Sequence, residues 1–118
     1  MRLTLGGLID LLTNRPDDQR VWFDFGGLSP TTIDSYRGYY EDAALGFSQE
    51  TDPTVPQVLA ELRGAIGKVV TGYKGGDFEL HRNSRLWVAN YGRTSDTAIV
   101  GVEECDYTTI LRTEWCES

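Results

Sequence analysis

The chain has 118 residues, of which 40% are hydrophobic and 25% charged, which excludes a disordered or collagen-like protein and fits one domain, residues 1–118. Its 18 acidic and 11 basic residues give a formal net charge of −7, which argues against binding to a nucleic-acid backbone, because neutralising phosphates requires a basic surface. The N-terminal segment lacks the features of a signal peptide, and no stretch approaches the ~20 apolar residues of a membrane span. We therefore expect a cytoplasmic protein.

Two segments predict amphipathic helices that begin after a threonine. Residues 5–12 and residues 55–62 each place apolar side chains at the spacing i, i+3, i+4 and i+7, which puts them on one helical face. Thr4 and Thr54 precede these segments and are suited to the N-cap position. Gln57 completes a capping box for the second helix.

Each predicted helix is followed by an aromatic strand that stops at a glycine. The stretch VWFDFGG, residues 21–27, aligns with LWVANYG, residues 86–92, and each has a tryptophan at its second position. The shared helix, cap and strand predict an internal duplication with repeats at about 3–47 and 53–103. The second repeat carries an extra segment between helix and strand, and that segment contains GYKGG.

The rest of the chain predicts strands joined by short turns. The β-forming runs are the tail of SYRGYYEDAALGF and the stretches DFEL, TAIVGVEE and YTTILRTEW. Because the gaps between the last strands are short, hairpins are favoured, and the sheet is expected to be antiparallel or mixed. The predicted fold class is α+β, with one mainly antiparallel sheet and two helices on one face.

Two short stretches share a tyrosine, a cation and a glycine in that order. Glycine lets backbone amides approach an anion, the cation neutralises phosphate, and tyrosine offers a face on which a base stacks. The same pattern is typical of glycine turns with solvated cations and with tyrosines packed at a sheet edge. The candidate ligand-binding residues, which include two at the end of a predicted strand, are Tyr36, Arg37, Gly38, Tyr39, Tyr73, Lys74, Gly75, Gly76, Asn90 and Tyr91.

The other chemically active side chains favour structural roles. His81 stands alone in a predicted turn, and Cys105 and Cys116 with one histidine are too few for a usual zinc site. Scattered carboxylates accompanied by cations are explained by salt bridges and turns without general acid–base catalysis. We expect no catalytic residues, no metal site and no cofactor. The carboxylates in question are Asp34, Glu41, Asp42 and Asp77.

The stretches DSYRGYYEDAALGF, GYKGGDFEL and RLWVANYG, followed by TAIVGV, resemble a family of small accessory proteins encoded by tailed bacteriophages. The resemblance covers residues 21–102, and its motifs are specific. It implies no activity, but it implies a setting, the cytoplasm of a bacterial host. Small phage accessory proteins often counteract host defence by sequestering a nucleotide signal or by binding a host protein.

The leading hypothesis is a non-catalytic phage-type binding protein that sequesters a small anionic, nucleotide-like ligand. Arg37 and Lys74 would neutralise phosphate, the glycines beside them would complete the cradle, and sequestration would favour a homo-oligomer. The alternative is an acidic inhibitor that occupies a basic groove of a host protein, including by nucleic-acid mimicry. A third hypothesis is a small enzyme acting on nucleotides. None of these predicts a membrane partner.

Overall fold

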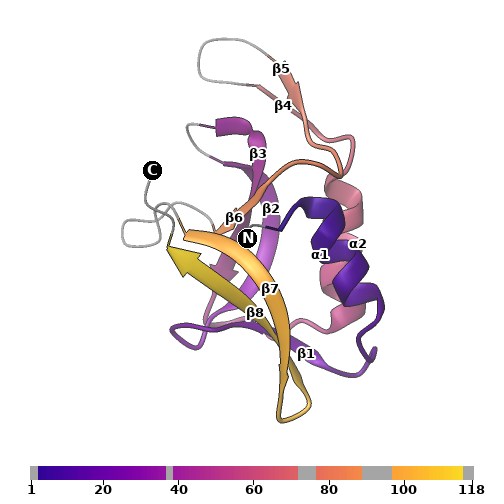
Figure 1. The fold of residues 1–118 in the computed structure, drawn as a ribbon, viewed down its shortest axis with the longest axis vertical. Coiled ribbons are helices and arrows are strands. Elements are labelled where there is room, and N and C mark those ends of the chain that lie inside the picture. The colour runs from indigo at the N-terminus through magenta and orange to yellow at the C-terminus, as the bar shows by residue number, and fades with distance from the viewer. Residues whose placement is uncertain (1–2, 37–38, 72–76, 89–96, 116–118) are drawn as a thin grey trace.

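The computed structural model describes residues 3–36, 39–71, 77–88 and 97–115 (Figure 1). Helices and strands account for most of the described chain. In chain order the elements are α1 (Leu5–Thr13), β1 (Arg20–Phe23), β2 (Ser29–Tyr36), β3 (Tyr39–Ser48), α2 (Val55–Ala65), β4 (Val69–Thr71), β5 (Asp77–Glu79), β6 (Leu86–Val88), β7 (Thr97–Cys105) and β8 (Thr108–Trp115).

Both predicted helices form, and both begin at the predicted threonines. Thr4 Oγ1 accepts a hydrogen bond from the backbone N–H of Gly7 at 3.1 Å, and Gln57 Oε1 accepts one from the backbone N–H of Thr54 at 2.9 Å. The apolar faces are buried as their spacing predicts. The two faces contribute Leu5, Leu8, Ile9, Leu12, Val55, Val58, Leu59 and Leu62 to one hydrophobic core.

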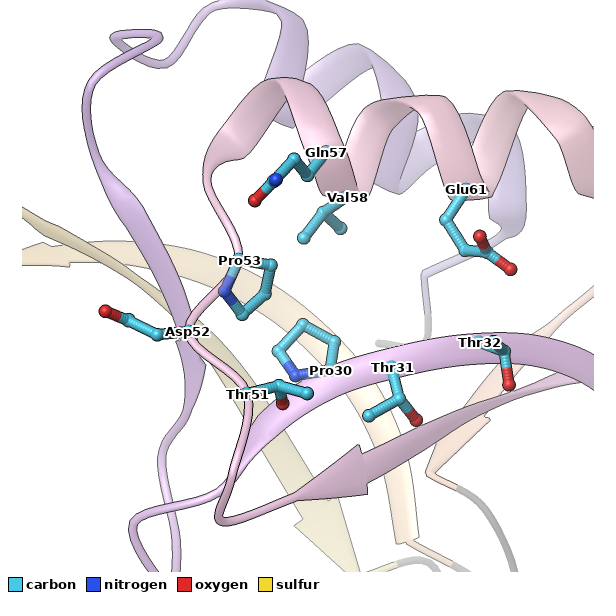
Figure 2. Close-up of a pocket in the computed structure, with 9 residues that line it drawn as sticks. All are labelled: Pro30, Thr31, Thr32, Thr51, Asp52, Pro53, Gln57, Val58 and Glu61. Carbon is cyan, nitrogen blue, oxygen red and sulfur yellow. The ribbon is translucent and has the colours of Figure 1, made fainter.

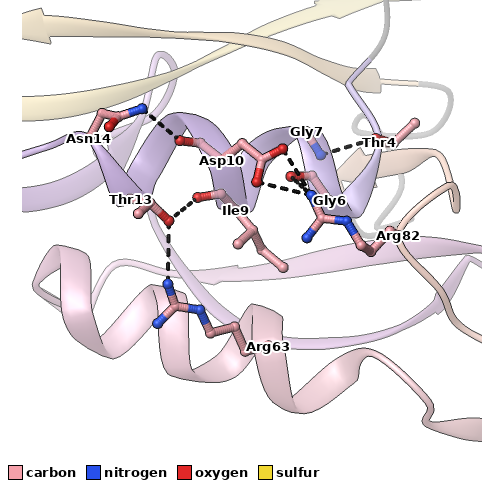
Figure 3. A network of polar contacts seen from close by, with 9 residues as sticks. All are labelled: Thr4, Gly6, Gly7, Ile9, Asp10, Thr13, Asn14, Arg63 and Arg82. Carbon is pink, nitrogen blue, oxygen red and sulfur yellow. Dashed lines mark hydrogen bonds and ion pairs between the residues drawn. The ribbon is translucent and has the colours of Figure 1, made fainter.

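Polar contacts fix α1 against its neighbours (Figure 3). Arg82, in the turn before β6, donates from Nη2 to both carboxylate oxygens of Asp10 at 2.9 Å. Arg63 of α2 donates to Thr13 Oγ1 at 3.3 Å, so the two helices are also joined at the surface.

The main sheet has six strands in the order β1-β8-β7-β6-β3-β2 and is mixed. The pairs β2/β3, β6/β7 and β7/β8 are antiparallel, whereas β1/β8 and β3/β6 are parallel. The α+β class is confirmed, and the sheet is mixed, with three antiparallel pairs and two parallel pairs that the predicted mainly antiparallel sheet did not include. Short connections in the sequence predict only hairpins between consecutive strands. The two parallel pairs join strands that are far apart in the chain, so the sequence gives no local sign of them.

The sheet curves until its two outer strands approach one another, so that it is nearly a barrel (Figure 1). The backbone N–H of Phe23, at the end of β1, donates to the carbonyl oxygen of Leu28, just before β2, at 2.9 Å. The helices lie side by side, with α2 against β1 and β2 and with α1 against β7. The helices therefore pack against a curved, mixed and nearly closed sheet, and the prediction of two helices on one face of a mainly antiparallel sheet holds only as far as the α+β class.

The two halves of the chain pair their strands in the same register. Trp22 of β1 lies opposite Ile110 of β8, and Trp87 of β6 lies opposite Ala44 of β3, at matching places in the two parallel pairs. The antiparallel hairpin β7/β8 has an irregularity after Ile99, and β2/β3 has one after Pro30 and a second between Ser35 and Tyr36. The irregularity after Pro30 and the one after Ile99 therefore also occupy matching places.

The start of each helix is joined to the other half of the chain. Thr4 bridges Arg85, and Thr54 bridges Arg20, both in antiparallel fashion. The strand pairings that correspond between the two halves extend to Glu114, which lies beyond the predicted end of the second repeat at residue 103. A duplicated unit would give these registers, although the duplication itself stays a prediction.

The extra segment of the second half contains β4 and β5, which form a separate two-stranded sheet (Figure 1). The backbone N–H of Leu80 donates to the carbonyl oxygen of Lys68 at 2.9 Å, and that of Gly67 donates to the carbonyl oxygen of Leu80 at 2.7 Å. These bonds close the base of the hairpin beside α2. In the first half the chain passes from α1 to β1 without such a hairpin.

Candidate functional site

Most residues of the predicted ligand site lie outside the described part of the chain. Tyr36 and Tyr39 pair with one another at the end of the β2/β3 hairpin, but their side chains also lie outside the description. The convergence of the two cation-glycine stretches on one pocket therefore stays a prediction. The residues outside the description are Arg37, Gly38, Tyr73, Lys74, Gly75, Gly76, Asn90 and Tyr91.

A groove of 520 Å³ lies between β2, α2 and the segment that precedes α2 (Figure 2). Val58 and Glu61 point from α2 toward β2, while Pro53 and Pro30 face one another at one end. A second hollow of 320 Å³ shares Glu61 and extends toward Lys68. The lining of the groove is Pro30, Thr31, Thr32, Thr51, Asp52, Pro53, Gln57, Val58 and Glu61.

The irregular part of β2 shapes one wall of the groove. Thr31 and Thr32 lie between the paired residues Pro30 and Ile33, where β2 has one residue more than β3. A Cβ atom at Gly46 of β3 would lie 2.5 Å from Thr31 Oγ1, so the Thr31 side chain requires a glycine opposite it. Gly46 therefore helps to set the position of Thr31.

The segment before α2 is held at the start of β2 by a buried serine. Ser29 Oγ donates to the carbonyl oxygen of Thr51 at 2.6 Å. The next residue, Asp52, accepts the indole N–H of Trp22 at Oδ1 at 3.0 Å, and Arg20 Nε lies 3.6 Å from Asp52 Oδ2. Asp52 is among the residues that line the groove, and its half-exposed carboxylate is held by β1 and points away from Val58 and Glu61 (Figure 2).

Toward the opposite end of the groove, the side chains of Glu61 and Lys68 form hydrogen bonds with the backbone of β2. Glu61 Oε1 accepts the backbone N–H of Ile33 at 3.4 Å, which is long for a hydrogen bond. Lys68 Nζ donates to the carbonyl oxygen of Ile33 at 3.0 Å. These side chains cover the backbone groups of an outer strand, which otherwise invite pairing with another strand.

The arginines of the described chain are already engaged by oxygen acceptors. Arg63 donates to Thr13, and the others lie beside carboxylates. Arg37 and Lys74, the cations of the predicted ligand site, lie outside the described residues. The ion pairs are Arg15–Glu104, Arg20–Asp52, Arg82–Asp10, Arg85–Asp42, Arg112–Asp24 and Arg112–Glu103.

The hydrogen-bond network around Glu104 joins β7 to the segment before β1. Gln19 Nε2 donates to Glu104 Oε2 at 2.8 Å, and Arg15 pairs with the same oxygen. Buried Thr109 donates to Gln19 Oε1 at 2.7 Å. Hydrogen bonds from Gln19 and Arg15, together with the charge of Arg15, hold the pKa of Glu104 below its usual range.

The carboxylate, histidine and thiol candidates have different surroundings. Asp42 is buried, accepts the indole N–H of Trp87 at 3.0 Å and lies 3.6 Å from Arg85 Nε, which is the expected structural role. His81 is exposed, and its Nδ1 accepts the backbone N–H of Asn83 at 3.1 Å. Cys105 is free and exposed. The side chains of Asp34, Glu41 and Asp77, and the whole of Cys116, lie outside the description.

The described residues include neither a metal-ion site nor a membrane-spanning helix. No group of three or more His, Cys, Asp or Glu side chains among them is placed to hold a metal ion. Neither helix in the described ranges is long and apolar enough to cross a membrane. Comparisons of the chain with protein-family models, curated proteins and solved structures return no match.

Proposed function

We propose that this protein is a non-catalytic binding protein that uses an acidic surface to engage a basic region of another protein. The observation that carries the proposal is a groove with two acidic residues, Asp52 and Glu61, in its lining, in a chain of net charge −7. Exposed acids that take part in no ion pair of the described chain support the same direction, because they set the sign of the field around them. The resemblance to phage accessory proteins supports the bacterial host cytoplasm as the compartment and a host protein as the partner.

Exposed acids outside the ion pairs are the residues with which to test the proposal. Asp17, Asp18 and Glu50 are exposed and take part in none of the ion pairs of the described chain. Glu103 and Glu104 are less suitable, because reversing their charge would also break native contacts with Arg112 and Arg15.

Affinity capture from a bacterial lysate at low and high salt, followed by mass spectrometry, tests the function. A specific partner should be retained at low salt, released at high salt, and lost on the change Asp17→Lys, Asp18→Lys and Glu50→Lys, because exposed charges act through a screened field. The matched neutral change of the same residues to Asn and Gln should give an intermediate loss. Retention that is equal at both salts and in all variants contradicts the proposal.

A second candidate is the capture of a nucleotide-like anion near the GYKGG stretch. The observation that favours it is that β4 and β5, which flank the GYKGG stretch, pair with one another and not with any strand of the main sheet. Arg37 and Lys74 would meet the phosphates, and Tyr36, Tyr39 or Tyr73 would stack on the base. Their glycines and the strand-end residues Asn90 and Tyr91 would complete the site.

Calorimetry against cyclic dinucleotides and ADP-ribose derivatives tests this second candidate. Arg37→Ala and Lys74→Ala should each abolish most of the heat, whereas Arg63→Ala, at a surface arginine between the helices, should not. If the unchanged protein gives no heat of binding with any compound of the panel, this second candidate is refuted. Turnover of any of these nucleotides would identify the third alternative, a small enzyme.

A further inference from the structure

The two halves of the molecule differ at one seam, where the segment in front of a helix meets the main sheet. In front of α1, the backbone N–H of Leu3 donates to the carbonyl oxygen of Ile99 in β7 at 2.9 Å. The carbonyl oxygen of Leu3 accepts the backbone N–H of Leu86 in β6 at 3.0 Å. Leu3 is therefore joined by its backbone to both strands, and this seam is closed.

The matching seam in front of α2 is closed on one side only. Pro53 comes directly before the N-cap of α2, as Leu3 comes directly before that of α1. The carbonyl oxygen of Pro53 accepts the backbone N–H of Val21 in β1 at 2.9 Å. Proline has no backbone N–H, so Pro53 cannot make the second bond, the one that Leu3 makes to β7. The seam between Pro53 and β2 is therefore open.

The carbonyl oxygen of Pro30 in β2 faces the open seam. The carbonyl oxygen of Leu28, just before β2, points to the outer edge of this strand, because it accepts the backbone N–H of Phe23 from β1 at 2.9 Å. Backbone groups alternate between the two edges of a strand, so Pro30, two residues on, points to the same edge. Pro30 also matches Ile99, since both stand at the start of a strand irregularity. Pro30 therefore presents a carbonyl oxygen at the place where Ile99 receives the N–H of Leu3.

The groove of 520 Å³ lies at this open seam, and Figure 2 shows Pro30 and Pro53 facing one another at one end of it. Val58 and the two proline rings provide apolar surface. The Asp52 carboxylate points away from the groove, and Glu61 is engaged by the backbone of β2. Recognition in the groove therefore draws on the Pro30 carbonyl oxygen and on apolar contact, and not on the two carboxylates.

We propose that the groove binds an extended segment of the partner protein, one backbone N–H of which donates to the carbonyl oxygen of Pro30. That N–H would make the bond that Leu3 makes to Ile99 at the closed seam, where the chain itself fills the matching place. A β-branched side chain, which favours an extended backbone, would pack on Val58. This inference rests on the proposed binding of a basic protein region and names what that region inserts.

The neighbours of the groove set the length and the charge of the bound segment. At Ile33 both backbone groups are engaged, the N–H by Glu61 and the carbonyl oxygen by Lys68, so pairing with β2 should end before Ile33. In the segment before α2, Glu50 is exposed and the Asp52 carboxylate is half-exposed. These charges favour lysine or arginine on either side of the inserted residue. The groove therefore fits a short extended stretch with basic flanks.

An NMR titration of the ¹⁵N-labelled protein with acetyl-Lys-Thr-Val-Thr-Lys-amide tests the site. This peptide has a β-branched centre and basic flanks, and it should shift the amide signals of Thr31, Thr32 and Gln57, which line the groove. Shifts confined to other residues, or no shift up to the solubility limit of the peptide, would overturn the proposal.

Two N-methylated analogues of the peptide identify the donor. One is methylated at the valine and the other at both threonines, because the N–H groups of these residues point to opposite edges of an extended chain. Only one of these edges can face β2, so one analogue should bind at least about threefold more weakly than the other, in the range that a lost hydrogen bond costs. Equal affinities of the two analogues would show that no backbone N–H is recognised and would refute the proposal.

A change to the protein tests the same bond from inside the molecule. Pro53→Ala supplies a backbone N–H at the open seam without filling the groove, and this N–H should donate to the Pro30 carbonyl oxygen. It should therefore be protected from hydrogen exchange, and the peptide should bind several-fold more weakly because its acceptor is occupied. Pro16→Ala, at an exposed proline before β1, is the matched control and should leave the affinity unchanged. An unprotected N–H at position 53, or equal weakening by both changes, contradicts the inferred bond.

The same pair of variants separates this inference from the general function. Salt-sensitive capture of a partner from the lysate should be weakened by Pro53→Ala and kept by Pro16→Ala. If capture survives Pro53→Ala undiminished, the protein binds a basic region elsewhere and the groove proposal is wrong. If the unchanged protein captures no partner, the proposed function fails, even where the peptide binds in the groove.

Discussion

Trp22 and Trp87 occupy equivalent register positions in the two halves, and each donates its indole N–H to an aspartate at 3.0 Å. The aspartates come from different places, Asp52 before α2 and Asp42 in β3. An arginine two residues before each tryptophan lies 3.6 Å from the same carboxylate. The two contacts differ in burial, since the Asp42 side chain is 6% exposed and the Asp52 side chain 56%.

This difference predicts unequal costs of removing the two carboxylates. Asp42→Ala removes a buried carboxylate that accepts the indole N–H of Trp87 and should lower the free energy of unfolding by about 2 to 4 kcal/mol. Asp52→Ala should cost no more than about 1 kcal/mol, because solvent replaces the lost contact. Urea unfolding followed by tryptophan fluorescence measures both. Equal losses would show that burial does not determine the strength of these contacts.

The close approach of Thr31 to Gly46 predicts a coupled pair of substitutions. Gly46→Ala places a Cβ atom 2.5 Å from Thr31 Oγ1 and should destabilise the protein by about 1 to 3 kcal/mol. Thr31→Ala removes the obstructing oxygen, so the double variant should recover most of that loss. A double-mutant cycle in urea gives the coupling. Strict additivity of the two changes would contradict the contact.

The lowered pKa of Glu104 predicts how its contribution to stability depends on pH. Its folded-state pKa lies below the ordinary 4.5, so the stability it contributes is fully present above that value and is lost as the pH falls through the folded pKa. The difference in free energy of unfolding between the unchanged protein and Glu104→Gln should be constant near neutral pH and shrink on acidification.

A partner substitution provides the control for Glu104. In an Arg15→Ala background the same Glu104→Gln change should have a smaller effect at neutral pH, because one hydrogen bond and the favourable charge are gone. Chemical unfolding at a series of pH values measures each difference. A Glu104→Gln effect that grows toward low pH would reverse the sign and refute the assignment.

The separate β4/β5 sheet predicts that the fold survives removal of the hairpin. Lys68 and Leu80 are joined by a backbone hydrogen bond of 2.9 Å, so residues 69–79 can be replaced by a short glycine turn between them. The circular dichroism of the main sheet should be kept and unfolding should remain cooperative. Removal of Leu80 as well, which is fully buried, should be far more damaging. Loss of cooperative unfolding in the shorter deletion would show that the hairpin is part of the core.

Local sequence pattern predicted the helices and most strands, because caps, helical spacing and β-forming runs act over a few residues. It missed β2, whose SPTTIDS sequence is rich in turn-forming residues. That sequence is tolerated because β2 is an outer strand, where the missing N–H of Pro30 disturbs no ladder. The parallel pairs β1/β8 and β3/β6 were also missed, because nothing local to either strand records a partner so distant in the chain.

The groove was missed for a related reason. Its walls come from residues 30–32 and residues 51–61, which meet only in the folded molecule. Pro53 and Pro30 were the available signal, since each replaces a residue with a backbone N–H at the matching place in the other half. That signal can be read only once the strands are aligned by register. The cation-glycine stretches found by sequence lie largely outside the described residues and stay a prediction.

The backbone bridges Thr4–Arg85 and Thr54–Arg20 each join a residue of one half to a residue of the other, so the fold of each half depends on the other half. Two fragments separated in the exposed stretch around Glu50 would each lack part of the core and should become ordered only when mixed. The groove has β2 of one fragment and α2 of the other as its walls. A ligand bound there would therefore hold the fragments together, and reassociation of the split protein would report binding without any label on the ligand.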